Sequence, residues 1–412
     1  MKNTNLSASQ LMSLEDQYGA HNYHPLPIVL DRGEGVFVLD VEGKRYYDFL
    51  SAYSAVNQGH CHPKIVATLI DQAQKLTLTS RAFYNSQLGK YEAFITRYFG
   101  YEKVLPMNTG AEAVETAIKL CRKWAYEKKG LPENTAQIIV CDHNFHGRTT
   151  TIVSFSADCE AYGHYGPFTP GFIMIPYNDA GALEEILNKN NHIAGFLVEP
   201  VQGEAGAIVP DDGYLLQCFD LCKKHNALFI ADEIQTGIAR TGKLLACDYE
   251  DVHPDILILG KALSGGVYPV SAVLSDKEIM DVIQPGQHGS TFGGNPLAAA
   301  IAITALEVIR DERLAEKAFH LGILFREEMH KLCETSQIAT LIRGKGLLNA
   351  LIINNEGRSD LAWDICVKLS ENGLLAKPTH KNIIRFAPPL VITEDQLLEC
   401  VGIIRHTIKE FE

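Results

Sequence analysis

The sequence predicts an α/β protein with a large doubly wound domain on a mostly parallel sheet and a smaller α+β domain. Two patterns carry this prediction. In the middle of the chain, short and nearly continuously apolar runs alternate with helical patterns, as in parallel sheets buried on both faces. Closer to the C-terminus this alternation gives way to a mixed order of strands and helices. The length of 412 residues also suits two domains of about 100–200 residues each.

Four apolar runs are expected to form strands of the large sheet: residues 137–141, 194–198, 227–231 and 255–259. Thr109 and Gly110 mark the start of a helix. Its apolar face is formed by residues that recur at helical spacing, namely Val114, Ala117, Ile118, Cys121 and Ala125. A further helix is expected over residues 213–225, between the second and third runs.

The two ends of the chain predict the smaller units. Residues 36–47 suggest two strands around a turn at Glu42 and Gly43, and residues 51–63 suggest a loop. The later elements are a long helical stretch from about 296 to 333, a strand at 346–353, a helix at 360–372 stopped by Gly373, a strand at 383–386 and a last helix with a capping-box start at Thr393. We therefore expect an N-terminal arm and hairpin (1–50) that packs with the small domain, a large domain (51–300) and a small C-terminal domain (301–412).

Composition narrows the class of function. Apolar residues make up 46% of the chain, enough for a large core, and the net charge is −13. Nucleic acids and anionic membranes both require a basic footprint, so neither is expected as the main partner. No apolar run reaches the roughly 18 residues that span a bilayer. The polar start of the chain lacks a targeting pattern, and a cytoplasmic location is expected.

The cysteines and histidines do not predict a metal site. None of the ten cysteines forms a CxxC pair, and Cys218 and Cys222 share a helical face with Leu215 and Phe219, as core residues do. The segment 60–62 reads His-Cys-His, but adjacent side chains point in different directions and no second ligand pair follows at zinc spacing.

Polar side chains gather where the predicted strands end. Glu199 ends the second strand, Asp232 the third, and Lys261 follows the fourth, while residues 144–148 (Asn-Phe-His-Gly-Arg) follow the first. In open α/β sheets the ligand binds beyond the carboxyl ends of the strands. An Asp, a Lys, an aromatic ring and an Arg are thus expected to meet in one crevice.

That set of groups suits pyridoxal phosphate. Lys261 can form a Schiff base with the aldehyde, and Asp232 can keep the pyridinium nitrogen protonated so that the ring accepts electrons. Phe145 can lie on the ring, with His146 beside it. The phosphate needs backbone N–H groups at a helix N-terminus, which Thr109, Gly110 and Ala111 offer, and Ser290 and Thr291 can add a second contact.

Nucleotide hydrolysis is an alternative to pyridoxal-phosphate chemistry for this sequence. Residues 227–233 resemble a Walker B strand, and residues 237–243 match the first seven positions of a P-loop. Leu244, however, occupies the position of the hydroxyl that would hold Mg²⁺, and the near-P-loop follows the acidic strand instead of opening an earlier βα unit. These two departures argue against it.

From about Asp16 to the C-terminus the chain resembles the class III aminotransferases of fold type I, and among them the ornithine enzymes. The resemblance rests on segments 54–64, 79–85, 106–113, 198–206, 229–241, 259–266 and 385–389. The Gly-Lys-Ala-Leu-Ser-Gly-Gly and Ala-Asp-Glu-Ile-Gln-Thr-Gly segments suggest the class, and Arg-Ala-Phe-Tyr-Asn and Tyr-Ser-Ala-Val-Asn-Gln-Gly-His-Cys-His-Pro suggest the ornithine enzymes.

The resemblance implies a role for each matching residue. Lys261 carries the cofactor and later a proton, Asp232 pairs with the ring nitrogen, and Gln235 lies near the ring hydroxyl. The remaining implied roles are stacking by Phe145, phosphate binding by Gly110 and Ala111 with Thr291 from the neighbouring subunit, ornithine binding by Tyr53, Tyr84 and Arg148, and a substrate-switching pair of Glu204 and Arg385. His146 departs from the ornithine pattern, where Trp can occur. An active site shared across a homodimer is implied as well.

The reaction implied is ping-pong transfer of the δ-amino group of L-ornithine to 2-oxoglutarate. The products are glutamate and glutamate 5-semialdehyde, which cyclises to pyrroline-5-carboxylate, and the resemblance links them to arginine degradation and proline biosynthesis. The alternatives are acetylornithine or 4-aminobutyrate as donor; Tyr53 argues against an acetylated amine, because it would leave no room for the acetyl group. A racemase or decarboxylase would not need 2-oxoglutarate, and a purely binding role would not need both Lys261 and Asp232.

Overall fold

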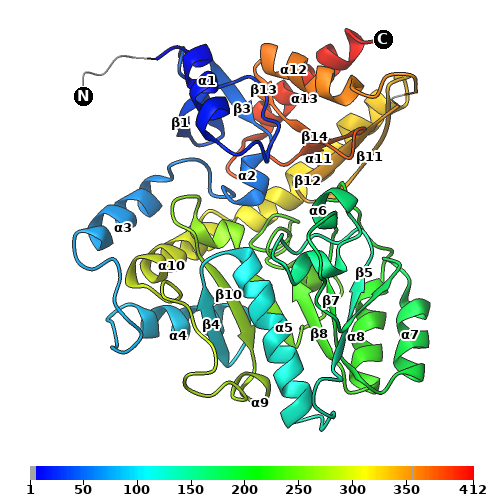
Figure 1. Cartoon of the computed structure of the whole chain (residues 1–412). Coiled ribbons are helices and arrows are strands. Elements are labelled where there is room, and N and C mark those ends of the chain that lie inside the picture. The colour runs from blue at the N-terminus through cyan, green and yellow to red at the C-terminus, as the bar shows by residue number, and fades with distance from the viewer. Residues whose placement is uncertain (1–5, 355) are drawn as a thin grey trace.

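The architecture rests on a seven-stranded sheet in the lower part of Figure 1. The computed structural model describes residues 6–354 and 356–412, so the first five residues of the predicted arm and residue 355 lie outside it. The sheet order is β4-β10-β9-β8-β7-β5-β6. Its strands are β4 Lys103–Met107, β5 Gln137–Cys141, β6 Phe172–Ile175, β7 Ile193–Val198, β8 Leu228–Asp232, β9 Ile256–Leu259 and β10 Ser271–Ser275.

The predicted parallel sheet is confirmed. Strands β9, β8, β7, β5 and β6 pair in parallel, whereas β10 is antiparallel to both β9 and β4. All residues of β7, β8 and β9 are buried, as their continuous apolar runs predict.

Helices cover both faces of this sheet, as a doubly wound fold requires (Figure 1). On one face α5 (Gly110–Glu127) packs its apolar side against alternate residues of the central strands. On the other face α7 (Ala180–Lys189) and α8 (Tyr214–Lys224) cover the remaining alternate residues. The other helices of this part are α3 Pro63–Ala73, α4 Leu88–Phe99, α6 Cys159–Tyr162, α9 Lys277–Met280 and α10 Pro296–Asp311, with 3₁₀ turns at Ile152–Phe155, Ala246–Tyr249 and Lys261–Ser264.

Two four-stranded sheets form the upper part of Figure 1, where α1 and α13 both lie. One has the order β11-β12-β15-β14, with strands Ala339–Lys345, Leu348–Ile353, Ile383–Phe386 and Lys377–Thr379. The other has the order β1-β2-β3-β13, with strands Leu30–Glu34, Phe37–Asp40, Arg45–Asp48 and Leu374–Leu375. The helices here are α1 Ala8–Tyr18, α11 Leu314–Cys333, α12 Leu361–Glu371 and α13 Glu394–Lys409.

The N-terminal hairpin thus joins the C-terminal elements, because β3 pairs in parallel with β13. The domain limits at residues 50 and 300 stay a prediction. None of the helices in residues 6–354 and 356–412 combines the length and apolar character that crossing a bilayer requires.

The helical stretch expected from about 296 to 333 has the expected ends but is divided into two helices. The chain forms α10 and α11 with a break at Arg313, whose φ of 52° is left-handed. Both helices bury an apolar face in the same core, so the hydrophobic periodicity continues across the break and does not reveal it.

Candidate active site

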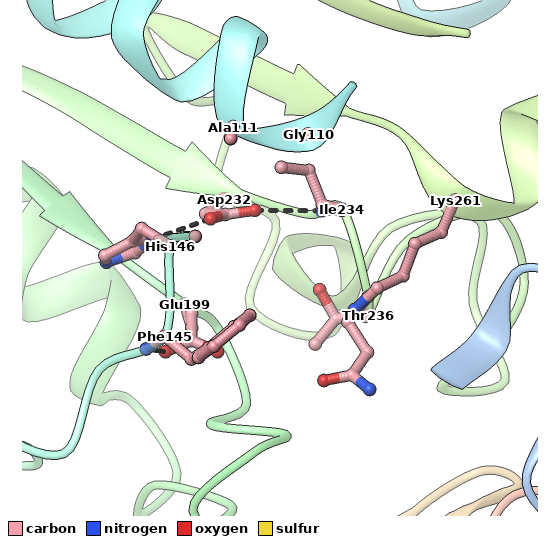
Figure 2. A pocket seen from close by; sticks show the side chains of 11 residues that line it. Gly110, Ala111, Phe145, His146, Glu199, Asp232, Ile234, Thr236 and Lys261 are labelled. Carbon is pink, nitrogen blue, oxygen red and sulfur yellow. Dashed lines mark hydrogen bonds and ion pairs between the residues drawn. The ribbon is translucent and has the colours of Figure 1, made fainter. Parts of the chain in front are cut away.

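A cavity of about 140 Å³ lies beyond the carboxyl ends of the parallel strands, at the predicted crevice (Figure 2). Its walls come from the ends of β7 and β8, the segment after β5, the turn after β9 and the start of α5. The residues that line it are Gly110, Ala111, Phe145, His146, Gly147, Glu199, Asp232, Ile234, Gln235, Thr236 and Lys261. Seven of these were predicted as site residues; Gly147, Glu199, Ile234 and Thr236 were not.

Asp232 and His146 form a buried pair at one wall of the cavity. Nδ1 of His146 lies 2.7 Å from Oδ2 of Asp232, while Oδ1 accepts a hydrogen bond from the Ile234 N–H (Figure 2). Burial lowers the pKa of His146, but the hydrogen bond and charge of Asp232 outweigh it, so the net pKa is raised. The two contacts therefore fix the direction of the Asp232 carboxylate, as a partner for a pyridinium nitrogen requires. His146 lies behind Asp232 in this arrangement.

Glu199 stands at the strand end where the sequence predicts it, but the sequence assigned it no role at the site. It is buried at the end of β7, and its carboxylate accepts a hydrogen bond from the Phe145 N–H at 2.9 Å. Burial raises the pKa of Glu199 to about 7. The contact holds the Phe145 segment against the sheet, which sets where the Phe145 ring meets the cavity. Its place at a strand end beside Pro200 is the sequence signal that could have found it.

Lys261 reaches into the cavity from the turn after β9 (Figure 2). Its backbone is left-handed, with φ of 41°, a costly conformation for a residue with a side chain and one that is common at functional sites. Burial of the amine lowers the pKa of Lys261 to about 8, although the Asp232 carboxylate opposes the shift. A larger share of the amine is therefore neutral, and nucleophilic, at physiological pH than for an exposed lysine.

The start of α5 offers an anion site. The N–H groups of Gly110 and Ala111 have no hydrogen-bond partner among the described residues, while Thr109 and Glu112 close a capping box one residue further out. A Cβ atom at Gly110 would lie 3.1 Å from the Ile234 side chain, so the backbone approaches the cavity closely only with glycine. Free N–H groups at a helix N-terminus are the phosphate site that the cofactor requires.

Tyr53, Glu204 and Arg385 form a second group beside the cavity. Nη1 of Arg385 lies 2.5 Å from Oε2 of Glu204, and its guanidinium stands 4.8 Å from the centre of the Tyr53 ring. Tyr53 belongs to α2 (Ser51–Ser54), a short turn in which all four residues are left-handed. The Asp48 carboxylate holds this turn by accepting hydrogen bonds from the Leu50 and Ser51 N–H groups.

Other predicted residues lie apart from the cavity. Tyr84 is fully exposed, and Thr291 is exposed as well. Ser290 accepts a hydrogen bond from Asn108 near the start of α5. Arg148 is exposed, with its guanidinium 6.0 Å from the Phe145 ring centre. This chain alone thus does not bring Tyr84 and Thr291 to the site.

The groups on the cavity wall fit pyridoxal phosphate: an amine, a buried carboxylate held by a histidine, a ring and free N–H groups. They do not resemble a metal centre; within residues 6–354 and 356–412, no three His, Cys, Asp or Glu side chains gather in a way that could hold an ion. His60 and His62 of the His-Cys-His segment bond separately to Asp48 and Glu312.

Comparison with known proteins agrees with this site. An "Ornithine aminotransferase, mitochondrial" from Drosophila melanogaster is 60% identical over 98% of this chain and 92% of its own length. A crystal structure from Elizabethkingia anophelis, described as an acetylornithine aminotransferase, is 65% identical with a TM-score of 0.91 and covers 98% of this chain and 100% of its own.

A solved ornithine aminotransferase from Toxoplasma gondii, described with partial occupancy of PLP at its active site, is 48% identical with a TM-score of 0.96, over 98% of this chain and 94% of its own. The sequence profile described as class-III aminotransferases matches residues 18–408. The chain therefore belongs to the class-III aminotransferase family, the enzymes that use pyridoxal phosphate to move amino groups.

Proposed function

We propose that the protein transfers the δ-amino group of L-ornithine to 2-oxoglutarate, giving glutamate and glutamate 5-semialdehyde, which cyclises to pyrroline-5-carboxylate. The observation that carries the proposal is the Glu204–Arg385 ion pair beside Tyr53 and Lys261. The names of the Drosophila melanogaster and Toxoplasma gondii relatives support the same donor.

The ion pair lets one pocket accept two unlike substrates. Glutamate and 2-oxoglutarate carry a carboxylate next to the reacting carbon, whereas the δ-carbon of ornithine has none. An unpaired Arg385 would favour glutamate and 2-oxoglutarate and would misplace ornithine. When Arg385 is paired with Glu204, its charge is masked. A bidentate arginine–carboxylate contact can replace that pair when 2-oxoglutarate binds. We assign the α-carboxylate of ornithine to Arg148, which lies further out.

Each residue has a separate part in the proposed reaction. When bound, pyridoxal phosphate supplies the aldehyde that condenses with amines and the ring that accepts electrons from the substrate carbon. Lys261 holds the cofactor and then, as a free amine, carries a proton from the δ-carbon of ornithine to C4′ of the cofactor. These residues line the cavity that would hold the cofactor: Asp232 would pair with the ring nitrogen, Phe145 would cover one ring face, Gln235 would contact the ring hydroxyl, and the start of α5 would bind the phosphate.

A second donor has support of its own, since the Elizabethkingia anophelis structure is described as an acetylornithine aminotransferase. Steady-state kcat/KM values for L-ornithine, N-acetylornithine and 4-aminobutyrate, each with 2-oxoglutarate, decide between them. We expect L-ornithine to exceed both others by about 100-fold, because a pocket closed by Tyr53 and the ion pair excludes the acetyl group and offers 4-aminobutyrate no second anchor. A higher value for N-acetylornithine would overturn the proposal.

We also propose a homodimer with the active site at its interface. Two neighbouring loops present exposed apolar rings: Phe83 and Tyr84 on one, and Phe292 beside Thr291 on the other. The loops are adjacent, because a Cβ at Gly294 would meet Arg81. Their burial against a second copy would place Tyr84 and Thr291 at its cavity; light scattering at micromolar protein concentration tests the assembly.

The cytoplasmic location stays a prediction. The relatives from Drosophila melanogaster and Rattus norvegicus are named mitochondrial. Imaging of a C-terminally tagged chain distinguishes the two compartments. We also propose a part in arginine degradation or proline biosynthesis. The reason is the chemistry of the product, since pyrroline-5-carboxylate is structurally intermediate between ornithine and proline.

A further inference from the structure

Lys377 stands directly across from Arg385 in the small-domain sheet. Strands β14 and β15 are antiparallel, and Lys377 is the register partner of Arg385. Residues opposite each other in such a pair project from the same face of the sheet. Lys377 and Arg385 therefore project from the same face of the sheet, the face on which Arg385 pairs with Glu204.

Lys377 lies close to the Glu204–Arg385 ion pair, but its amine forms no ion pair with any described residue. It is half-buried and lines, with Tyr53, an apolar cavity next to the active site. Burial lowers the pKa of Lys377, the Arg385 charge lowers it further, and the Glu204 carboxylate opposes both. Among the described residues no carboxylate forms an ion pair with Lys377, which leaves its amine available.

The proposed two-substrate pocket leaves one charge unaccounted for. When Arg385 turns to a substrate carboxylate, Glu204 loses the one ion-pair partner that it has among the described residues. The Glu204 backbone stays where it is, since its carbonyl accepts a hydrogen bond from the Thr379 hydroxyl on β14. A carboxylate left unpaired at a half-buried position is costly, so a second cation within reach of β14 would stabilise it.

Of the other cations near Glu204, Arg343 and Lys261 already have a place. Arg343 donates to the carbonyls of Ala205 and Gly206, which fixes its guanidinium to the backbone. Lys261 belongs to the cofactor cavity, and Arg148 is exposed beside Phe145. Lys377 combines an amine without an ion-pair partner among the described residues, the same sheet face as Arg385, and a pKa that responds to the charges of both members of the pair.

We propose that Lys377 is a positioning residue: it forms an ion pair with the Glu204 carboxylate when Arg385 binds 2-oxoglutarate or glutamate. This proposal rests on the proposed function of the Glu204–Arg385 pair. It makes Lys377 a determinant of the second half-reaction, with no part in the ornithine half-reaction, during which Glu204 and Arg385 stay paired.

The test measures the two half-reactions separately by stopped-flow absorbance on holoenzyme. Lys377→Met is expected to slow the 2-oxoglutarate half-reaction about fivefold, the scale of a partly exposed ion pair, and to change the ornithine half-reaction by less than about twofold. Lys377→Arg should restore the rate, because it keeps the charge. Lys381→Met, at the exposed tip of the same hairpin, is the matched control and should change neither half-reaction.

A double-mutant cycle separates action through Glu204 from direct contact with substrate. In a Glu204→Gln background there is no carboxylate to hold, so adding Lys377→Met should cause no further loss. A loss that persists there, equal slowing of both half-reactions, or no slowing at all would each overturn the proposal. Lys377→Gln serves in place of Lys377→Met if thermal melting shows that the latter is poorly folded.

The design also distinguishes this inference from the donor assignment. The second half-reaction uses only 2-oxoglutarate or, in reverse, glutamate, so it can be measured whichever amine is the natural donor. If ornithine is inert but the glutamate half-reaction still depends on Lys377, the proposed donor is wrong and the proposed role of Lys377 stands.

Discussion

Nδ1 of His146 lies 2.7 Å from Oδ2 of Asp232, and both side chains are buried. The sequence places these residues 86 positions apart; the order of β5 and β8 in the sheet brings them together. The contact makes His146 a support for Asp232, while its predicted contact with the cofactor stays a prediction.

Replacing His146 with Asn should give a pH-dependent loss of stability. The folded pKa of His146 is raised, because the hydrogen bond and charge of Asp232 outweigh burial. A raised pKa adds stability that is complete below the unfolded value of about 6.5 and is lost as the pH rises through the folded value. Urea unfolding of the cofactor-free protein should therefore show the largest difference between wild type and variant near pH 6. A difference that grows with rising pH would contradict the assignment.

Asp232→Asn should lower kcat by about 100- to 1000-fold, the scale of removing one preorganised charge partner. The amide cannot stabilise a protonated ring nitrogen, so electron uptake by the cofactor weakens. Steady-state assays check this, with exposed Asp212→Asn as a control that should leave kcat unchanged. Similar activity in the two variants would remove Asp232 from the proposed mechanism.

The lowered pKa of Lys261 predicts how fast the protein captures its cofactor. Burial brings the pKa to about 8, and only the neutral amine attacks the aldehyde. After addition of pyridoxal phosphate to cofactor-free protein, the rise of the visible absorption band should accelerate with pH through about 8 and then level off. A midpoint near about 10.4, the ordinary lysine value, would show that the amine is not buried in this way.

Arg240 should matter for stability more than for chemistry. Its fully buried guanidinium donates to Asn57 and to the carbonyls of Leu347 and Pro388, and burial lowers its pKa to about 9. Arg240→Met leaves these acceptors unpaired and should cost about 2–4 kcal/mol in the free energy of unfolding. Exposed Arg97→Met should stay within about 0.5 kcal/mol. Equal costs in urea unfolding would refute this role.

The same contacts explain the P-loop-like pattern of residues 237–243. Arg240 and Thr241 inside it are buried, and Gly346 packs against the Thr241 backbone. The segment joins the large sheet to the C-terminal elements, and its glycines permit close packing.

Elements that depend on local sequence were predicted well. The bounds of β5 and β15 match the predicted runs. Thr109 caps the helix whose start it was expected to mark, and Thr393 forms the predicted capping box. Strand β4 was missed because it contains Pro106, which argues against a strand except at a sheet edge, where β4 lies.

The less predictable parts depend on tertiary contacts. The Glu199 carboxylate is fixed by a hydrogen bond from the Phe145 N–H, 54 positions earlier in the chain. The strand-end position of Glu199 is visible in the sequence, but this contact is not. By contrast, Asp232 and Lys261 were predictable because parallel strands direct their carboxyl ends to one edge.

The most direct test adds L-ornithine alone to cofactor-loaded wild-type protein and follows the visible absorption band of the bound aldehyde. The account predicts that the band disappears, that pyrroline-5-carboxylate forms in an amount equal to the enzyme, and that 2-oxoglutarate restores the band; Lys261→Ala should show no turnover. An unchanged band with ornithine, or turnover by Lys261→Ala at a substantial fraction of the wild-type rate, would contradict it.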